Sequence, residues 1–329
     1  MRCWIIIDFY RMSVYRPIGG YLELELRKGE HYHKDAIRLN TARNCFEYVL
    51  RSRNYFKVYV PYYTCEVMLE PIRELGIEFE FYHINKLLEP LSLPRLGKDE
   101  AFLYTNYFGL KQDCAKRLAD VFENQLIVDD AQAFFAEPIQ GIDTFYSPRK
   151  FFGVPDGAYL YTEKRLEQDI KQDVSCERMS HLLKRIDMGA EVGYQDFRNN
   201  DDSLSNQDIK WMSKLTESLL SGINYEEAKQ RRRENYALLD DALKESNLIH
   251  FEFDSNAVPL VYPFLTEDET LRWRLIENKV FVATYWPNVK EWCNSNDFEY
   301  HLAQNMVFLP VDQRYGKEEM QSVLNVLNQ

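Results

Sequence analysis

Residues 126–132 read Leu-Ile-Val-Asp-Asp-Ala-Gln, and this stretch decides the fold class. The apolar run 126–128 is short and is flanked by polar residues on both sides, which is typical of a buried strand. We expect the strand to end at Asp129-Asp130. In sheets built from parallel strands, ligands bind beyond the carboxyl ends of the strands. Asp129 is therefore the first candidate site residue.

Helices and short strands alternate on the N-terminal side of this stretch. Apolar residues at helical spacing predict helices over residues 41–51, 68–75 and 115–122. Short apolar or alternating runs predict strands over residues 58–60, 77–82 and 101–104. Such alternation favours right-handed βαβ crossovers, so we predict an α/β fold with a large, mostly parallel sheet.

The pattern of predicted elements changes near Ser203. Long helical stretches follow at 207–220 and 225–246, with further helices near 267–277 and 317–327 and short strands at 249–253, 258–261, 280–283 and 307–309. This predicts a large α/β domain over residues 12–220 and a smaller C-terminal α+β domain over 221–329. Residues 1–11 are interpreted as an extraneous extension, with Met12 as an alternative start to Met1.

Composition narrows the function classes. The 329 residues include 40 Lys and Arg against 52 Asp and Glu, which gives a net charge of −12 and argues against a nucleic-acid partner. No apolar run is long enough to cross a membrane, so no membrane partner is expected. Six scattered cysteines form no C-x-x-C pair, so we expect no metal site and a cytoplasmic location. His31 and His33 are interpreted as loop histidines.

A lysine follows Asp129 at a distance that suggests a particular chemistry. Lys150 lies 150 − 129 = 21 residues further on, in a loop marked by glycine and proline. A carboxylate at a strand end and a lysine in a nearby loop are what pyridoxal phosphate chemistry requires. The lysine amine forms a Schiff base with the aldehyde. The carboxylate keeps the pyridine nitrogen protonated, so that the ring can accept electrons.

Further motifs occur in the order expected of one family, and the chain here resembles the DegT/StrS sugar aminotransferases. These are pyridoxal-phosphate enzymes of the aspartate aminotransferase fold. The resemblance runs from about Leu39 to Gly157 and more loosely beyond. The matching positions are Asp129 and Gln132 for Asp-x-x-Gln, Ser147 and Lys150 for Ser-x-x-Lys, Thr41, Ala42 and Arg43 for the phosphate loop, residues 61–64 for Pro-x-x-Thr, and residues 106–109 for His-x-x-Gly.

The resemblance implies roles for these residues. Lys150 would be the Schiff-base lysine and proton shuttle, and Asp129 would hold the pyridine nitrogen. Gln132 would lie beside the ring's oxygen edge or the phosphate. The phosphate would be held by Thr41, Arg43 and the first amides of the following helix, with Ser147 as a further donor.

The chain departs from the family pattern at several of these positions. Ala42 replaces a glycine of the phosphate loop, and Arg43 replaces a small hydroxyl residue, which it could offset as a charged phosphate ligand. Cys65 occupies the position of the ring-stacking aromatic, so Tyr63 or Tyr62 is the hypothesised stacking residue. Asn206 is the candidate for the asparagine that the partner subunit supplies in this family.

The family implies a homodimeric, cytoplasmic aminotransferase with its active site at the subunit interface. It would transfer an amino group from an amino acid such as glutamate to a nucleotide-linked keto-sugar, a step of polysaccharide biosynthesis. Two alternatives remain. One is a pyridoxal-phosphate enzyme of another type, such as a lyase, a dehydratase or an enzyme with an amino-acid substrate. The other is a non-catalytic binding or regulatory relative.

Three other features have plain interpretations. The triplet Arg231–Arg233 is expected to be a solvated helix face, and residues 199–203 an exposed polar loop. Residues 285–287, Tyr-Trp-Pro, could line a substrate mouth or pack in the core.

Overall fold

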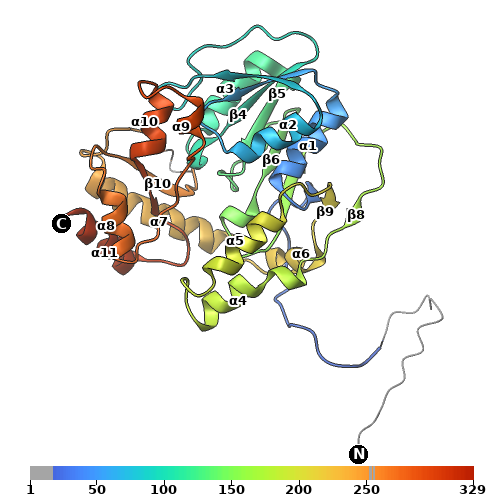
Figure 1. The fold of residues 1–329 in the computed structure, drawn as a ribbon. Helices are drawn as coiled ribbons and strands as arrows, with labels where there is room; N and C mark the ends of the chain where they lie inside the picture. Colours follow the sequence, from blue (N-terminus) through green and yellow to red (C-terminus); the bar gives the residue numbers. More distant parts are fainter. Residues whose placement is uncertain (1–17, 252–253, 255) are drawn as a thin grey trace, which may run out of the picture.

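The computed structural model describes residues 18–251, 254 and 256–329 of the chain. A large sheet forms its centre, with the strand order β3-β2-β4-β5-β6-β7-β1-β9-β8 (Figure 1). The strands are β1 Ile37–Leu39, β2 Lys57–Pro61, β3 Glu78–Tyr82, β4 Glu100–Thr105, β5 Leu126–Asp130, β6 Asp143–Tyr146, β7 Ala158–Tyr161, β8 Lys171–Gln172 and β9 Lys210–Trp211. Strands β3, β2, β4, β5 and β6 are parallel neighbours, and β7 and β1 add antiparallel pairs. The predicted α/β fold is confirmed.

Both faces of the sheet are buried, which explains why its central strands are continuously apolar. On one face, Leu103, Ile127 and Phe145 pack with helix α1 (Ala42–Arg53) and helix α2 (Leu69–Glu74). On the other face, the alternate residues join a second core that includes helix α3 (Gln112–Phe122). The ladder pairs Asp129 of β5 with Phe145 of β6.

A second part of the chain is built on a two-stranded antiparallel sheet of β10 (Val261–Leu265) and β11 (Met306–Pro310). Helices α7 (Tyr225–Leu243), α8 (Leu271–Glu277) and α11 (Lys317–Leu327) pack on it and form a third core. The remaining helices here are α9 (Val289–Trp292) and α10 (Phe298–Asn305). This agrees with the predicted α+β character, while the domain boundary at residue 220 stays a prediction.

Several predicted elements differ from the structure. Residues 258–260 precede β10 instead of forming a strand, and Ala283 makes only an isolated bridge to Phe308. Helix α6 (Lys214–Ser221) begins later than predicted because β9 occupies residues 210–211. The expected polar loop 199–203 is the last part of helix α5 (Tyr194–Ser203), which follows α4 (Ser180–Asp187). The proposed extension 1–11 and part of the strand predicted at 249–253 lie outside the described residues.

One buried ion pair fastens α1 to the sheet. The Arg53 guanidinium donates from Nε and Nη2 to the two oxygens of Asp143 at the start of β6, at 2.8 and 2.9 Å. The Arg53 and Asp143 side chains are 8% and 1% exposed. Losing the arginine would therefore leave a carboxylate buried without its counter-ion.

We predict that Arg53→Met lowers the free energy of unfolding by about 3–5 kcal/mol, because it strands the Asp143 charge. Urea denaturation followed by circular dichroism measures this change. Arg73→Ala is the matched control, since Arg73 pairs with Glu66 at 3.6 Å on the surface and should lose less than about 1 kcal/mol. Equal losses of stability in the two variants would contradict the conclusion that the buried Arg53–Asp143 ion pair holds α1 on the sheet.

Candidate active site

The topology brings Asp129 and Lys150 to the same edge of the sheet. Strand β5 ends at Asp130, and its parallel neighbour β6 ends at Tyr146. Ser147 then begins a short 3-10 turn, Pro148–Lys150, which carries the lysine. Because Asp129 lies at the carboxyl end of β5 and Lys150 follows that of its parallel neighbour β6, 21 residues of sequence separation become neighbouring positions (150 − 129 = 21).

Asp129 is a buried carboxylate with one oxygen committed. The residue is 6% exposed, and its Oδ1 accepts a hydrogen bond from the Ala131 amide at 2.8 Å. Among the described residues, its second oxygen has no hydrogen-bond partner. Burial raises the pKa of Asp129, and the nearby Lys150 ammonium lowers it. The two groups are thus close enough for their charges to interact.

Lys150 is exposed, and its amine is uncommitted. Its Nζ atom lies 5.8 Å from the ring centre of Tyr285, and it makes no hydrogen bond or ion pair with any described residue. Tyr285 packs on Phe308, with ring centres 4.6 Å apart, so the second part of the chain forms one wall beside the amine. Burial raises the pKa of Tyr285 to about 12, which keeps its phenol neutral at physiological pH.

Cys65 lies beside the same two charged groups. Burial raises the pKa of its thiol, Lys150 lowers it, and Asp129 raises it further. The residue at the family's ring-stacking position is therefore in the site, although it is a cysteine. Asp129, Lys150, Cys65 and Tyr285 come from four separate segments of the chain and define the candidate site.

The turn that carries Lys150 is held by helices packed around it. Arg149 Nη2 donates to Asp201 of α5 at 3.0 Å, and Asn200 of α5 donates to the Pro155 carbonyl at 2.9 Å. The prediction of a loop at 199–203 is therefore wrong, because these residues belong to a helix that supports the lysine turn. Buried Asp156 accepts from the Ser213 amide and hydroxyl, at 2.9 and 2.7 Å, at the start of α6.

The predicted phosphate loop is the N-terminus of α1. Thr41 caps this helix, because its Oγ1 accepts from the Asn44 amide at 3.1 Å. Its hydroxyl donates to the Asn44 side chain at 2.6 Å. The amides of Ala42 and Arg43 begin the helix, where the partial positive charge favours an anion.

Arg43 does not point freely into this region. Its guanidinium forms an ion pair with Glu70 of α2 at 2.7 Å and donates to the Leu204 carbonyl at 3.2 Å. The Asn206 amide also donates to Glu70, at 2.5 Å. Arg43 thus already has a carboxylate partner within the chain. The amides at the N-terminus of α1 are therefore more available than its guanidinium to donate hydrogen bonds to an anion.

Both candidate stacking tyrosines already pack against other aromatic rings. The Tyr63 side chain is fully buried between Tyr107 and Trp286, and its hydroxyl donates to the Tyr285 carbonyl at 2.8 Å. Tyr62 stacks on Phe81, with ring centres 4.6 Å apart. Both rings already have aromatic neighbours, and the hypothesis that Tyr63 or Tyr62 stacks on a cofactor ring stays a prediction.

Gln132 and Ser147 are both buried at this edge. Gln132 Oε1 accepts from the Phe108 amide at 3.0 Å, while its Nε2 is buried with no partner among the described residues. Ser147 is 7% exposed and immediately precedes the lysine turn. Gly109 ends the 106–109 turn at φ +76°, and a Cβ there would lie 3.0 Å from the Val258 carbonyl, so the turn requires glycine.

Asp130 is a residue whose importance the sequence did not reveal. It is 1% exposed and accepts from Asn106 Nδ2 at 2.9 Å. The buried Tyr146 hydroxyl also interacts with this carboxyl group. Burial is the main reason why the pKa of Asp130 is raised to about 8: the Asp129 charge also raises it, while the hydrogen bonds of Asn106 and Tyr146 lower it. Asp130 is therefore protonated at neutral pH, beside an ionisable Asp129.

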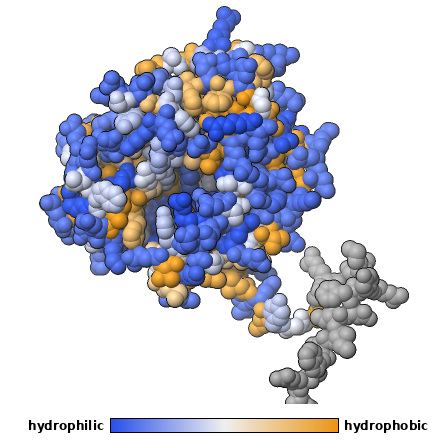
Figure 2. All heavy atoms as spheres, in the orientation of Figure 1, coloured by the Kyte–Doolittle hydropathy of each residue, from blue (hydrophilic) through white to orange (hydrophobic). Residues whose placement is uncertain are grey.

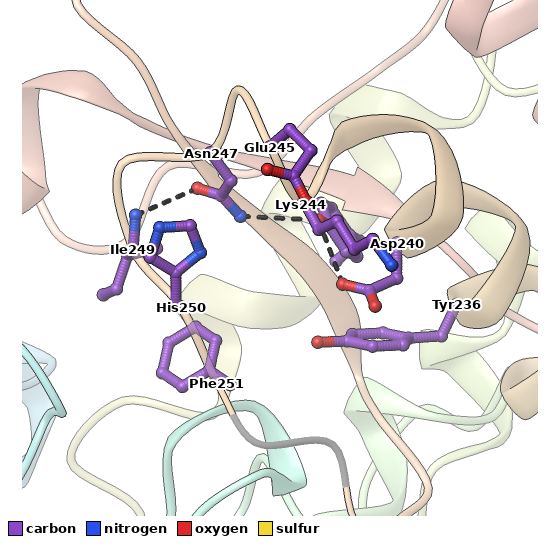
Figure 3. A pocket seen from close by; sticks show the side chains of 9 residues that line it. Tyr236, Asp240, Lys244, Glu245, Asn247, Ile249, His250 and Phe251 are labelled. Carbon is purple, nitrogen blue, oxygen red and sulfur yellow. Dashed lines mark hydrogen bonds between the residues drawn. The ribbon is translucent and has the colours of Figure 1, made fainter.

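Two cavities lie away from these groups. One, of about 220 Å³, is lined by residues of α7 and β10 such as Tyr236, Asp240 and Tyr262 (Figure 3). The other, of about 320 Å³, lies between the turns after β4 and β5 and α7, and is lined by Gly109, Ala133 and other residues. Neither cavity is lined by Lys150 or Asp129. Figure 2 shows that the surface between the two parts of the chain is hollowed.

The described residues offer neither a metal site nor a membrane-spanning helix. They contain no cluster of three or more His, Cys, Asp or Glu side chains that could hold a metal ion. His33 instead hydrogen-bonds the Phe134 carbonyl at 2.7 Å, and His31 the Tyr159 hydroxyl at 2.5 Å. Over the same residues, no helix has both the length and the apolar character needed to cross a membrane.

The large mixed sheet followed by a small antiparallel one is the architecture of the sugar aminotransferases. The structure is similar to sugar aminotransferase CalS13 from Micromonospora echinospora, with TM-score 0.60, 13% identity, and coverage of 89% of this chain and 87% of that one. It is also similar to a DegT DnrJ EryC1 StrS aminotransferase from Brucella abortus, with TM-score 0.57, 14% identity, and coverage of 89% and 85%.

A third similar structure is NtdA from Bacillus subtilis, which was solved with the cofactor PMP bound. Its TM-score is 0.59, its identity 13%, and the coverage 89% of this chain and 73% of that one. No family model matches the sequence, and no curated protein matches it. At such low identity, the likeness establishes the fold alone.

We predict that Asp130→Asn removes part of the pH dependence of stability. The folded pKa of Asp130, about 8, lies above its unfolded value, so its stabilising effect is complete below about pH 4 and is lost as the pH rises through about 8. Between pH 5 and 7 the wild-type free energy of unfolding should fall more steeply than the variant's, by up to about 1.4 kcal/mol per pH unit. Parallel urea-unfolding curves would contradict the protonated assignment.

Proposed function

We propose that the protein is a pyridoxal-phosphate-dependent aminotransferase. The observation that carries this proposal is the pairing of an uncommitted amine at Lys150 with a buried, half-satisfied carboxylate at Asp129, on the ends of adjacent strands. A free lysine amine serves as a nucleophile toward an aldehyde, and a buried carboxylate serves as the partner of a protonated ring nitrogen.

The residues present fit this cofactor at its ring end. Asp129 retains one oxygen for a ring N–H donor, and Gln132 retains a buried amide donor with no partner among the described residues. The first amides of α1, capped by Thr41, supply donors for a phosphate. Because Arg43 forms an ion pair with Glu70, the phosphate would depend more on the helix amides than the family pattern implies.

When bound, the cofactor supplies an electron sink for the electron pair left when a proton leaves the substrate carbon. The chain's own part is to position and move protons. Asp129 would hold the ring by a charge-assisted hydrogen bond, and Lys150 Nζ would accept and return the substrate proton as a general base and acid. Tyr285 shields one side of that amine with an aromatic wall.

The structural neighbours support a proposal about the substrate. CalS13 is a sugar aminotransferase, and the present fold matches it over most of both chains. We therefore propose a nucleotide-linked keto-sugar as the amino acceptor and an amino acid such as glutamate as the donor, in the cytoplasm. Another pyridoxal-phosphate reaction is the second candidate, favoured by Cys65 at the ring-stacking position.

The proposed enzyme is a homodimer, because one end of the molecule exposes many apolar side chains. Figure 2 shows apolar patches at the lower end of the view, where Figure 1 places α4 and the segment that leaves the body from residue 18. The exposed apolar residues there are Ile18, Tyr21, Leu22, Leu24, Leu183, Ile186, Met188, Val192, Tyr194 and Phe197. Exposed apolar patches of this kind mark a protein interface.

Borohydride reduction tests the cofactor assignment. We expect purified protein incubated with pyridoxal 5′-phosphate to gain a visible absorption band and, after reduction, a covalent pyridoxyl adduct on Lys150 that mass spectrometry locates. Lys150→Ala should abolish the adduct. Lys111→Ala, which removes a lysine paired with Glu89 at 2.8 Å, is the matched control and should retain it. An adduct that persists at an unchanged level in Lys150→Ala would overturn the proposal.

Addition of an amino donor distinguishes the candidate reactions. With glutamate, an aminotransferase should lose the visible band as the amino group passes to the cofactor and 2-oxoglutarate appears in solution. A protein that binds the cofactor but transfers no amino group from any amino acid would favour another reaction type. A protein that never binds the cofactor would favour a binding or regulatory role.

The exposed α4–α5 surface gives a test of the dimer. Ile186 is 81% exposed, so a polar substitution there should not disturb the fold of one subunit. We expect Ile186→Glu to shift the mass measured by light scattering at micromolar concentration from that of a dimer toward that of a monomer. Lys214→Glu, at the start of α6, is the charge control. A wild-type protein that is already monomeric would contradict the proposed assembly.

A further inference from the structure

A buried arginine, Arg232, lies at the centre of helix α7. It is 1% exposed, although the sequence suggested a solvated triplet 231–233. Burial lowers its pKa to about 10, against the raising by Asp312, so the side chain stays charged at neutral pH. The prediction of a solvated face is therefore wrong for this arginine, because α7 is packed between the second sheet and the lysine turn.

The charge of Arg232 is neutralised by no carboxylate within ion-pair distance in the described part of the chain. Its donors go to the carbonyls of Pro259 and Leu260, at 3.2 and 3.1 Å, and to the side-chain oxygen of Gln313, at 2.9 Å. The nearby Asp312 is bound instead by Arg314, at 2.7 and 2.9 Å. Burying a charge on neutral acceptors is unfavourable compared with packing an apolar side chain.

The remaining contacts of Arg232 lead to the lysine turn. Its Nη2 donates to the carbonyl of Phe151, the residue after Lys150, at 3.4 Å. Gln313 Nε2 donates to the same carbonyl at 2.8 Å. The guanidinium also lies 4.5 Å from the centre of the Phe151 ring. One backbone carbonyl and one ring beside Lys150 are thus held by two side chains from the second part of the chain.

This contact completes the support of the turn. Helices α5 and α6 hold the lysine loop at Arg149, Pro155 and Asp156. Arg232 and Gln313 hold it at Phe151, on the side where Tyr285 lies beside the amine. The second part of the chain therefore fixes both the backbone after Lys150 and the surroundings of its Nζ atom.

We propose that Arg232, together with Gln313, is a positioning residue that fixes the Lys150 amine relative to Asp129. The inference rests on the proposed function, since it concerns the reactivity of that amine toward pyridoxal phosphate. A displacement of about 1 Å at a reacting group lowers a rate by up to about 100-fold. The alternative is that Arg232 only packs α7 against β10.

The test uses the full-length protein and pyridoxal 5′-phosphate as the probe. Arg232→Gln removes the charge, Arg232→Lys keeps it with fewer donors, and Gln313→Leu removes the second donor to Phe151 from a half-buried position. Arg233→Ala is the matched control, because Arg233 also donates from α7 to carbonyls, those of Ala257 and Asn256, but makes no hydrogen bond to the lysine turn. The rate of borohydride-trapped adduct formation at Lys150 is measured by mass spectrometry.

A second readout separates positioning from a general loss of structure. Reductive methylation of Lys150 by formaldehyde demands little orientation, so it reports only whether the amine is accessible. We expect Arg232→Gln to slow the pyridoxal phosphate reaction by about 10- to 100-fold while methylation stays within twofold. Arg232→Lys should recover part of the rate, Gln313→Leu should slow it by about 3- to 10-fold, and Arg233→Ala should match wild type.

Each other outcome has a defined meaning. Wild-type adduct rates in both Gln313→Leu and a folded Arg232→Gln overturn the inference and leave the proposed function standing. Equal slowing of the two reactions also overturns it, since the substitution then only hides or unfolds the lysine. If Arg232→Gln does not fold, Gln313→Leu decides alone. If wild-type protein forms no adduct at Lys150, the proposed function fails and the inference falls with it.

Discussion

The parallel pairing of β5 with β6 is the constraint on which the candidate site depends. It sets Asp129 opposite Phe145, so that the turn after β6 must start at the edge where Asp129 lies. The acid is buried and the amine is exposed, and the amine still lowers the pKa of the acid against the raising effect of burial. A carboxylate held in a low-dielectric environment, with an exposed amine beside it, is suited to holding a cationic ring and to moving a proton.

The lysine turn is supported far more heavily than a surface loop requires. Side chains of α5 and α6 and the pair Arg232–Gln313 hold it from different directions. Satisfied hydrogen bonds from several elements rigidify the backbone of this turn. The structure therefore places its polar side chains where the position of one amine depends on them, which is what catalysis by orientation demands.

The sequence predicted the N-terminal α/β alternation because each element there has a strong local pattern, as at residues 126–128. It did not predict β6 or β7, whose short runs make sense only beside their neighbours in the sheet. Asp129 and Lys150 could be proposed as site residues from the sequence because strand ends and glycine-marked loops are local features. The burial of Arg232, the protonation of Asp130 and the pairing of Arg43 with Glu70 arise from contacts between distant segments, to which one sequence gives no local signal.

The central claim is that one amine and one acid of this chain hold a single pyridoxal phosphate between them. A crystal structure of the protein grown with the cofactor tests it most directly. The account predicts continuous density from Lys150 Nζ to the cofactor's C4′ atom, with an Asp129 oxygen within hydrogen-bond distance of the ring nitrogen and the phosphate at the N-terminus of α1. Density for the cofactor elsewhere, or with Asp129 turned away from its ring, would contradict the account.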